Sequence, residues 1–463
     1  MKISTQLKAG GITRNHNEAL GAGNPANGAG RRLLMGGVER ILNGTHAWRK
    51  RFALLIAAVM MTFTTADISG QIIAVYPWYL NPDDFVEITA GNHHTCARKR
   101  NGNVYCWGRN DLGQLGIGYT GGPVNTMQFV TVAAQIDAGT DHTCAIDFGG
   151  AASCWGYNGT AGTFGALGAN FNMQMQGSPG ADIWPRPIAV DGNLVFNAIS
   201  AGQSSTCGTT TTGLFCWGAI ATQAGAGGQP TPMLVDSWTG YQRLAVGRKH
   251  ACAVAVWGTW RQAACLGDNS AGQLAQDPAA SFLTFLPPSF LGFPMSSLFA
   301  NPTTRLATQV DFTCAEGIGG LQCAGRNTWG QLGNGNRNDT FQPQTVPAVN
   351  GQALRGVSTG VNHACALDAN GAAFCWGLDE FGQTGNNTYG PFTHFTSPQA
   401  VTGGFAFRAV AAGRDHTCGI ATTNAIYCWG SNSYGQMGAG RSATQRIGPL
   451  RFLVAPSPWD PVR

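Results

Sequence analysis

Fourteen cysteines are the residues of this 463-residue chain with the greatest capacity for chemistry. They form seven pairs whose members lie 9 to 13 positions apart. The pairs are Cys96 and Cys106, Cys144 and Cys154, Cys207 and Cys216, Cys252 and Cys265, Cys314 and Cys323, Cys365 and Cys375, and Cys418 and Cys428. Structural zinc sites usually place two ligands within a C-x₂₋₄-C spacing, which no pair here shows. Disulfide bonds are therefore the favoured use of these cysteines, with reduced buried thiols and a metal site as the alternatives.

Five histidines lie two positions before the first cysteine of a pair, and a serine and a phenylalanine take the equivalent places elsewhere. They are His94, His142, His250, His363 and His416, with Ser205 and Phe312 as the replacements. A catalytic centre needs unlike groups that converge, whereas these histidines occur once in each unit. The chain also has no G-x-S-x-G, H-E-x-x-H or P-loop motif. We therefore expect structural histidines, no catalytic or metal site, no cofactor and no enzymatic activity.

The elements that must position the cysteines are short strands. Each pair brackets a turn rich in Asn, Asp and Gly, such as "KRNGN" or "DANGA", and follows an apolar run such as "VEITAG". This pattern predicts three strands in each unit, with the two cysteines on the second and third. If Cys96 faces Cys106, the turn is centred on Asn101, beside Gly102. Directly opposite residues lie about 4.5 to 5.5 Å apart, which is close to the spacing of a disulfide.

The units recur about every fifty residues. Variants of His-Thr-Cys-Ala, Cys-Trp-Gly and Gly-Gln-Leu-Gly return in the same order along seven units, with Cys-Trp-Gly complete in five units and a Gly-Gln tail in five. The fourth and fifth copies are degraded, with Leu266 and Ala324 in place of the tryptophan. A period of this length indicates a propeller or a solenoid.

These motifs resemble the regulator of chromosome condensation repeat. Seven copies imply that family's all-β, seven-bladed β-propeller over residues 85–455, with one bridge inside each blade as in extracellular relatives such as crinkly-type receptor kinase ectodomains and secreted bacterial propellers. The segment "IGPLRFLV" resembles "TPMLVD" and "SPQAVT", which we interpret as strands that open their units. Since no such copy precedes Phe85, we expect the C-terminal strand to complete the first blade, followed by a tail at 456–463.

Charge is concentrated at the N-terminus. Residues 1–51 carry nine Lys/Arg against two acidic groups, which leaves 19 basic and 21 acidic groups in the rest of the chain. Nucleic-acid binders need a clustered basic surface, so we expect no nucleic-acid partner. Charged residues are only 11% of the chain and glycine reaches 66 residues, as expected for a domain rich in turns.

The N-terminal segment predicts export. We expect a disordered basic leader at 1–48, a hydrophobic signal peptide or signal anchor at 49–70, and a linker at 71–84. The apolar run 52–66 is too short for a membrane span of roughly 20 residues and fits the h-region of a signal peptide. An uncut anchor, an organelle-type leader and a later start at Met35 are the alternatives. With paired cysteines downstream, this predicts a secreted protein or one on the extracytoplasmic face of a membrane.

Two further features could serve binding. The segment 276–302 is rich in phenylalanine and poor in charge, so it is a candidate partner loop, although packing against the blade is the alternative. Its candidate residues are Phe282, Phe285, Phe290 and Phe293. In a secreted eukaryotic protein, three N-x-T sequons would be glycan acceptors on surface turns. They begin at Asn158, Asn338 and Asn386.

The sequence thus predicts a monomeric, disulfide-bonded propeller that binds an unidentified protein or glycan and contacts a membrane only through an uncut N-terminal anchor. The first alternative is an intracellular guanine-nucleotide exchange factor or chromatin adaptor, as the family resemblance implies. A secreted enzyme inhibitor is the second, and a hydrolase comes last.

Overall fold

The computed structural model describes residues 81, 83–159, 165–169, 182–219, 228–257, 260–275, 305–317, 320–438 and 445–451. The chain divides into two units, Met1–Pro77 and Trp78–Arg463, and every described residue belongs to the second. The expected leader, signal segment and most of the linker therefore lie outside the described residues. Within the described ranges, no helix is long and apolar enough to cross a membrane.

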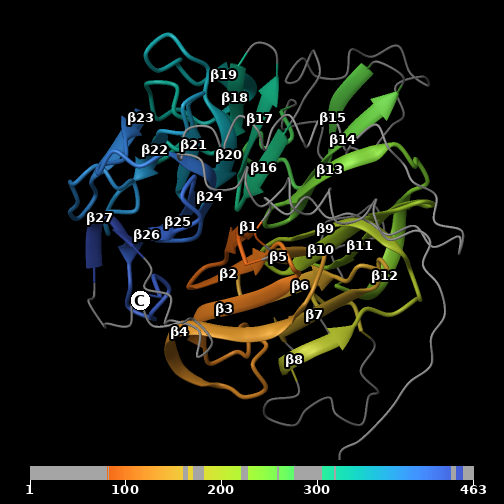
Figure 1. Cartoon of the computed structure of the whole chain (residues 1–463). Helices are drawn as coiled ribbons and strands as arrows, with labels where there is room; N and C mark the ends of the chain where they lie inside the picture. Colours follow the sequence, from red (N-terminus) through yellow and green to blue (C-terminus); the bar gives the residue numbers. More distant parts are fainter. Residues whose placement is uncertain are drawn as a thin grey trace, which may run out of the picture. The chain divides into compact units, whose positions relative to one another are not determined.

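The described strands form seven antiparallel sheets, each built from consecutive strands (Figure 1). The first three sheets are β1 (Phe85–Ala90), β2 (His94–Lys99), β3 (Asn103–Asn110) and β4 (Gly121–Val132); β5 (Gln135–Ala138), β6 (His142–Ile146), β7 (Ala152–Tyr157) and β8 (Ile183–Ala189); and β9 (Phe196–Ala201), β10 (Ser205–Thr210), β11 (Gly213–Gly218) and β12 (Gln229–Asp236).

The fourth sheet has three described strands, and the last three sheets have four each. They are β13 (Tyr241–Val246), β14 (His250–Trp257) and β15 (Trp260–Gly267); β16 (Arg305–Gln309), β17 (Phe312–Gly317), β18 (Gly320–Gly325) and β19 (Thr340–Thr345); β20 (Arg355–Thr359), β21 (His363–Leu367), β22 (Ala373–Leu378) and β23 (His394–Ala400); and β24 (Phe407–Ala412), β25 (His416–Ala421), β26 (Ile426–Ser431) and β27 (Gln445–Arg451).

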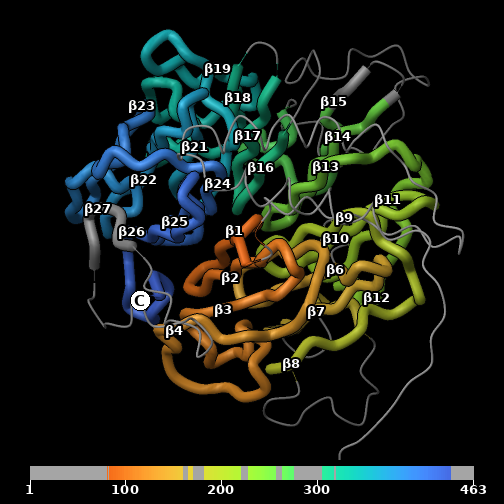
Figure 2. Tube along the Cα trace, viewed as in Figure 1, coloured from red at the N-terminus to blue at the C-terminus, as the bar shows by residue number. Residues whose placement is uncertain are grey.

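The first strands of the seven sheets form the inner ring of a closed wheel. Each of β1, β5, β9, β13, β16, β20 and β24 contacts the next, and β24 contacts β1. Figure 2 shows the last blade, in blue, returning beside the first, in orange. The predicted seven-bladed, all-β propeller is confirmed.

Every cysteine is bonded to its predicted neighbour, and each bond joins the second and third strands of one blade. The Cα–Cα distances are 4.0 to 4.1 Å, and no cysteine is free. The seven bonds join Cys96 to Cys106, Cys144 to Cys154, Cys207 to Cys216, Cys252 to Cys265, Cys314 to Cys323, Cys365 to Cys375, and Cys418 to Cys428. The predicted pairing of the cysteines, with one bridge inside each blade, is therefore confirmed.

The register of the hairpins explains why the two sulfurs of each pair meet. Cys96 is directly opposite Cys106 in the pairing of β2 with β3, and the other six pairs are opposite in the same way. Gly102 takes the expected place in the first of these turns with a φ of 93°, a conformation that glycine adopts without strain. The spacing of the cysteines in the sequence is thus the spacing of a hairpin.

The expected closure of the wheel by the C-terminal strand is wrong. β27 pairs with β26 and completes the seventh blade, while the first blade is complete with β1 to β4. The strands that we interpreted as opening their units, in β12 and β23, are in fact the last strands of their sheets. The sequence likeness of β27 to them is real, but it identifies an outer strand. The ring closes instead through side chains packed between the seventh and first blades, including Phe85, Trp107 and Met437.

The outer strands carry prolines. All six outer strands of the described sheets contain at least one, at positions 123, 185, 187, 230, 232, 343, 398 and 449. Proline removes a backbone donor, so it is tolerated at the edge of a sheet and opposes pairing with another chain. The rim of the wheel is thus poorly suited to strand addition.

Candidate interaction face

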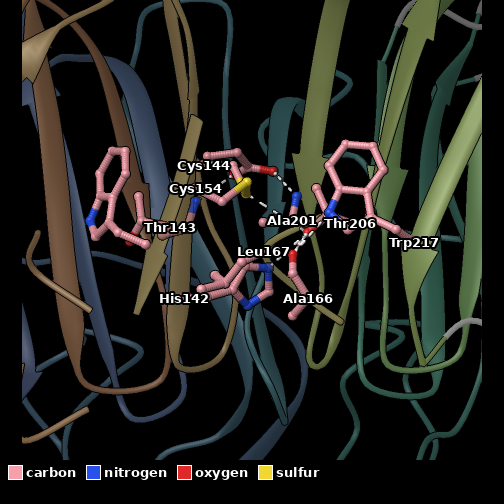
Figure 3. The surroundings of a disulfide bond; sticks show 12 residues. His142, Thr143, Cys144, Cys154, Ala166, Leu167, Ala201, Thr206 and Trp217 are labelled. Atoms are coloured by element: carbon pink, nitrogen blue, oxygen red, sulfur yellow. Dashed lines mark hydrogen bonds between the residues drawn. A yellow bond between two sulfur atoms is a disulfide. The ribbon is translucent and has the colours of Figure 1, made fainter. Parts of the chain in front are cut away.

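The motif histidines join neighbouring blades. In each of five cases Nε2 lies 2.9 to 3.0 Å from the hydroxyl oxygen of a threonine on the next blade. The pairs are His94 with Thr143, His142 with Thr206, His250 with Thr313, His363 with Thr417 and His416 with Thr95. Figure 3 shows the second of these pairs beside the Cys144–Cys154 bond. The prediction of structural histidines fits this geometry.

The protonation state of these histidines follows from their partners. The hydroxyl of Thr206 donates its proton to the carbonyl oxygen of Ala166 at 2.9 Å, so it must accept from His142. Nε2 therefore carries a proton, and the lowered pKa keeps the ring neutral near pH 7. Burial lowers the pKa of His142 to about 4 and that of His94 to about 3. These groups are thereby unsuited to proton transfer near neutral pH.

Histidine and threonine change together at the two exceptional junctions. Ser205 of the third blade precedes a fourth blade that has Ala251 at the threonine position. Phe312 of the fifth blade precedes a sixth blade that has Ala364. Phe312 and Ala364 replace the hydrogen bond by an apolar pair, whereas at the other exceptional junction the buried hydroxyl of Ser205 has no hydrogen-bond partner among the described residues.

The Gly-Gln tail of one blade is bound by the tryptophan of the next. Nε1 of Trp155 donates to the carbonyl oxygen of Gln114 at 3.1 Å, and the hydroxyl of Thr143 donates to the same oxygen at 3.0 Å. Gly113 in this tail has a φ of 72°, and a Cβ there would lie 2.8 Å from Cα of Pro185. Trp107, Trp217, Trp376 and Trp429 make the same type of bond to the preceding tail. The repeated words of the sequence therefore encode contacts between blades.

A buried Asn or Asp begins each described tail, and Asn158 is one of them. Its Oδ1 accepts a hydrogen bond from the backbone of Leu167 at 3.0 Å, as Asn110 does with Leu115 at 3.2 Å. Asn158 is only 8% exposed, so it is the least suited of the three predicted glycan acceptors. Asn338 is exposed and Asn386 is half-buried. Glycosylation at these two positions stays a prediction.

The strand order defines two faces of the wheel. Since the strands of each blade run alternately up and down, the loops after the first and third strands lie on one face, and the hairpin turns between the second and third strands lie on the other. We call the first the tail face, because it carries the Gly-Gln tails, and the second the hairpin face. Tyr434 of a tail lies 4.7 Å from the ring of His93 in a loop after a first strand, which confirms that both loop types share a face.

Charged and aromatic groups from several blades meet on the tail face. Arg109 pairs with Asp111 at 2.6 Å and Asp141 of the next blade at 3.6 Å, and its guanidinium lies 5.4 Å from the ring of Tyr434. Burial, with Arg414 and Arg109 nearby, lowers the pKa of His93 to about 4. The result is an ordered surface of mixed charge.

Further around this face, the carboxylate of Asp311 forms ion pairs with two arginines. Arg248 of the fourth blade and Arg326 of the fifth lie 3.9 and 3.4 Å from its carboxylate. Both arginines are exposed, so they could exchange this carboxylate for an acidic group of a partner.

A cavity of about 320 Å³ occupies the centre of the wheel. Residues of all seven inner strands line it, including Asp137, whose carboxylate accepts hydrogen bonds from the Thr89 hydroxyl at 2.9 Å and the Ala201 backbone at 2.9 Å. Burial raises the pKa of Asp137. These bonds join the first three blades, so Asp137 has a structural use.

The predicted phenylalanine loop lies outside the described residues. Among those described, no group of three His, Cys, Asp or Glu side chains could hold a metal ion. The surface residues of the tail face were missed in the sequence, because the residue before each Gly-Gln varies between blades: it is Leu112, Ala271, Trp329, Phe381 or Tyr434.

Comparisons with known proteins agree with the geometry. Two models of the regulator of chromosome condensation (RCC1) repeat match residues 85–114, 355–383 and 407–436, and 101–146, 319–367 and 370–420. The chain is 30% identical over 252 residues to the ultraviolet-B receptor UVR8 of Arabidopsis thaliana, a match that covers 52% of this chain and 54% of the receptor. It is 28% identical over 187 residues to the human probable E3 ubiquitin-protein ligase HERC4, covering 39% of this chain and 17% of the ligase. The chain thus spans about half the length of the receptor and less of the ligase.

Solved structures show the same architecture. Prp20p of Saccharomyces cerevisiae, described with its binding properties to Gsp1p and histones, aligns with a TM-score of 0.63 at 18% identity and covers 81% of this chain and 88% of its own. Human WBSCR16 aligns with a TM-score of 0.60 at 17% identity, covering 76% and 95%. At such identities the likeness concerns the fold alone. Together with the closed wheel and its repeated inter-blade contacts, these matches show a seven-bladed β-propeller in which residues 85–146 and 319–436 carry RCC1 repeats.

Proposed function

We propose that this chain is a non-catalytic interaction module that acts outside the cytoplasm, either secreted or held at the extracytoplasmic face of a membrane. The observation that carries the location is the pairing of all fourteen cysteines within their own blades. Structural disulfides persist in oxidising compartments and are rare in the cytosol. An intracellular exchange factor or chromatin adaptor would need these cysteines to be reduced, so the disulfides count against that alternative.

The tail face is the surface proposed for partner binding. The wheel holds its loops on rigid strands, and charged groups of separate blades, such as Arg109, Asp141 and Arg326, lie on this one face. The motif histidines, which could have served catalysis, are instead buried and bonded to threonine. Prp20p, with a similar fold, is described as binding Gsp1p and histones, which supports a protein as one class of partner for such a wheel.

The segments before the wheel have a proposed role in export. In this proposal residues 1–48 are a leader, 49–70 a signal peptide or anchor, and 71–84 a linker. A cleaved signal would release the propeller, whereas an uncut one would hold it at the membrane.

The location is tested by expressing the complete chain in a secreting host and trapping free thiols with N-ethylmaleimide before analysis. We expect the protein in the medium, a new N-terminus between residues 65 and 71, and no labelled cysteine. A cytosolic protein with labelled cysteines would overturn the proposal. A membrane-bound protein with unlabelled cysteines would support the anchored form.

The binding face is tested by charge reversal. The protein is cross-linked to the extracellular proteins of its source, and the cross-linked partners are identified by mass spectrometry. Arg326→Glu on the tail face should remove specific cross-links, while Arg100→Glu at a turn of the hairpin face should keep them. The reverse pattern would assign recognition to the hairpin face.

A further inference from the structure

Phe392 combines two features that are unfavourable in an isolated domain. Its side chain is 75% exposed, the largest exposed fraction among the described large hydrophobic residues. Its backbone has a φ of 62°, in the left-handed region that bulky side chains rarely adopt. Strain of this kind concentrates at functional sites, where the surrounding structure enforces it.

The surrounding structure does enforce this conformation. The loop is closed by a hydrogen bond from the backbone of Thr393 to the carbonyl oxygen of Gly390 at 3.0 Å, and the backbone of Asp379 donates to the carbonyl oxygen of Thr393 at 2.7 Å. Nδ1 of His394 lies 2.8 Å from the carbonyl oxygen of Phe392, where it can donate. Phe392 is therefore presented by a fixed turn.

Phe392 lies next to an aromatic residue of the preceding blade. Its ring is nearly parallel to that of Trp329, with an interplanar angle of 15° and centroids 6.5 Å apart, and His394 meets Trp329 edge-on at 6.3 Å. Trp329 belongs to the Gly-Gln tail of the fifth blade, and its backbone donates to Oε1 of Gln331 at 2.9 Å. We call Trp329, Phe392 and His394 the aromatic platform. It bridges two blades on the tail face.

The two loops that carry the aromatic platform also carry charged and amide side chains. Arg337 lies over the ring of Trp329 at 5.9 Å, and its Nε donates to the carbonyl oxygen of Thr328 at 2.7 Å. The carboxylate of Asp339 accepts from the backbone of Asn327 at 2.7 Å. The two charges thus have partners within the loop and balance each other. The same two loops carry exposed amides at Asn336, Asn338 and Asn387.

We infer that the aromatic platform binds a neutral glycan chain. The faces of aromatic rings are negatively polarised, so they attract the polarised C–H groups on the flat face of a sugar ring. Amide side chains both donate and accept, which matches the hydroxyls at the edge of that sugar. An acidic glycan or a charged peptide would need several like charges, whereas Arg337 and Asp339 carry opposite ones. Two adjacent rings on an open surface fit consecutive sugars of a polymer better than a single small molecule.

This inference rests on the proposed function, because it requires the module to meet extracellular glycans. It is tested by affinity electrophoresis of the complete, oxidised protein in gels that contain hydroxyethyl cellulose, galactomannan, laminarin or, as the acidic probe, polygalacturonate. We expect at least one neutral polymer to retard the protein, and polygalacturonate to have no effect.

The deciding variant is Phe392→Gly. Glycine adopts the left-handed conformation without strain, so this variant should keep or raise the melting temperature. Its affinity for the neutral polymer should fall at least tenfold, because the aromatic ring is lost. Phe148→Ser is the matched control, because Phe148 is 69% exposed at a turn of the hairpin face; it should bind as the native protein does.

Three results would overturn the inference: no retardation by any neutral polymer, retardation that Phe392→Gly leaves unchanged, or retardation by polygalacturonate alone. The proposed function is measured separately by secretion and thiol trapping. A secreted, thiol-free protein that binds no neutral polymer would therefore refute the aromatic platform without refuting the extracellular module.

Discussion

His416 of the seventh blade and Thr95 of the first blade, 321 residues apart in sequence, are joined by a hydrogen bond of 2.9 Å. The hydroxyl of Thr95 also donates to the carbonyl oxygen of Gln436 at 3.0 Å, and Nε1 of Trp107 donates to the same oxygen at 2.9 Å. The same three contacts join the first blade to the second, the second to the third and the sixth to the seventh. The junction between the seventh and first blades, which we call the seam, is therefore built like these three junctions.

The first prediction concerns this seam. Thr95→Ala alone should lower the free energy of unfolding by about 1–3 kcal/mol, because it leaves Nε2 of His416 buried without a partner. His416→Phe alone removes one of the two hydrogen bonds of the Thr95 hydroxyl, so it should cost about 0.5–1.5 kcal/mol. The double variant copies the natural pair of Phe312 and Ala364. Its loss of unfolding free energy should therefore be clearly smaller than the sum of the losses in the two single variants. Denaturation of the oxidised protein measures the difference, and strictly additive losses would contradict the coupling.

The second prediction concerns pH. Burial lowers the pKa of His250 to about 4, whereas an unfolded histidine titrates near 6.5. Below pH 6.5 the unfolded chain binds a proton that the folded chain does not, so this histidine's contribution to stability falls on acidification by about 1.4 kcal/mol per pH unit. The double variant His250→Phe with Thr313→Ala should therefore gain stability relative to the native protein between pH 6.5 and 4.

That comparison is made against the native protein because carboxyl groups act in the opposite direction. Burial raises the pKa of Asp379 and of Asp415 to about 6, so their contribution is present at low pH and is lost as the pH rises toward 6. Both proteins retain these groups, so the difference between them isolates the histidine. Melting temperatures measured at half-unit steps of pH provide the test, and a difference that does not change with pH would contradict it.

The third prediction concerns the disulfides. Each bond closes a short loop and should contribute about 2–3 kcal/mol, so the seven together exceed the usual stability of about 5–15 kcal/mol for a folded domain. Full reduction should unfold the wheel, as seen by loss of near-ultraviolet circular dichroism. Removal of one bond, by Cys96→Ala with Cys106→Ala, should lower the melting temperature but leave a folded protein. A reduced and alkylated chain that keeps its melting temperature would refute this account.

The fourth prediction distinguishes the two ways to close the wheel. Deletion of residues 446–463 should expose backbone amides of β26 in the seventh blade, which pairs with β27, and leave those of β3 in the first blade protected. Hydrogen exchange measured blade by blade reads this directly. Loss of protection in β3 with retention in β26 would restore the closure that the sequence first suggested.

The sequence predicted the repeated part of the molecule well and its unrepeated part poorly. Cysteine spacing predicted the register of Cys96 with Cys106, because the residue numbers of directly opposite residues in a hairpin always add up to the same total. The role of β27 was misassigned because the strands that it resembles, β12 and β23, were interpreted as opening their units, although the proline that all three strands carry marks an outer strand. Phe392 was missed because two structural features distinguish it: a left-handed backbone conformation and a contact with Trp329 of another blade. Neither feature produces a periodic pattern in the sequence.

Since no strand is shared between the first and seventh blades, the position of the chain ends is not what holds the ring together. The ends could be joined and a new break opened at another junction, and each blade would still offer its histidine, or the serine or phenylalanine that replaces it, to the blade that follows it. The order of blades around the axis is set by the side chains at their borders, which makes the molecule a candidate for circular permutation.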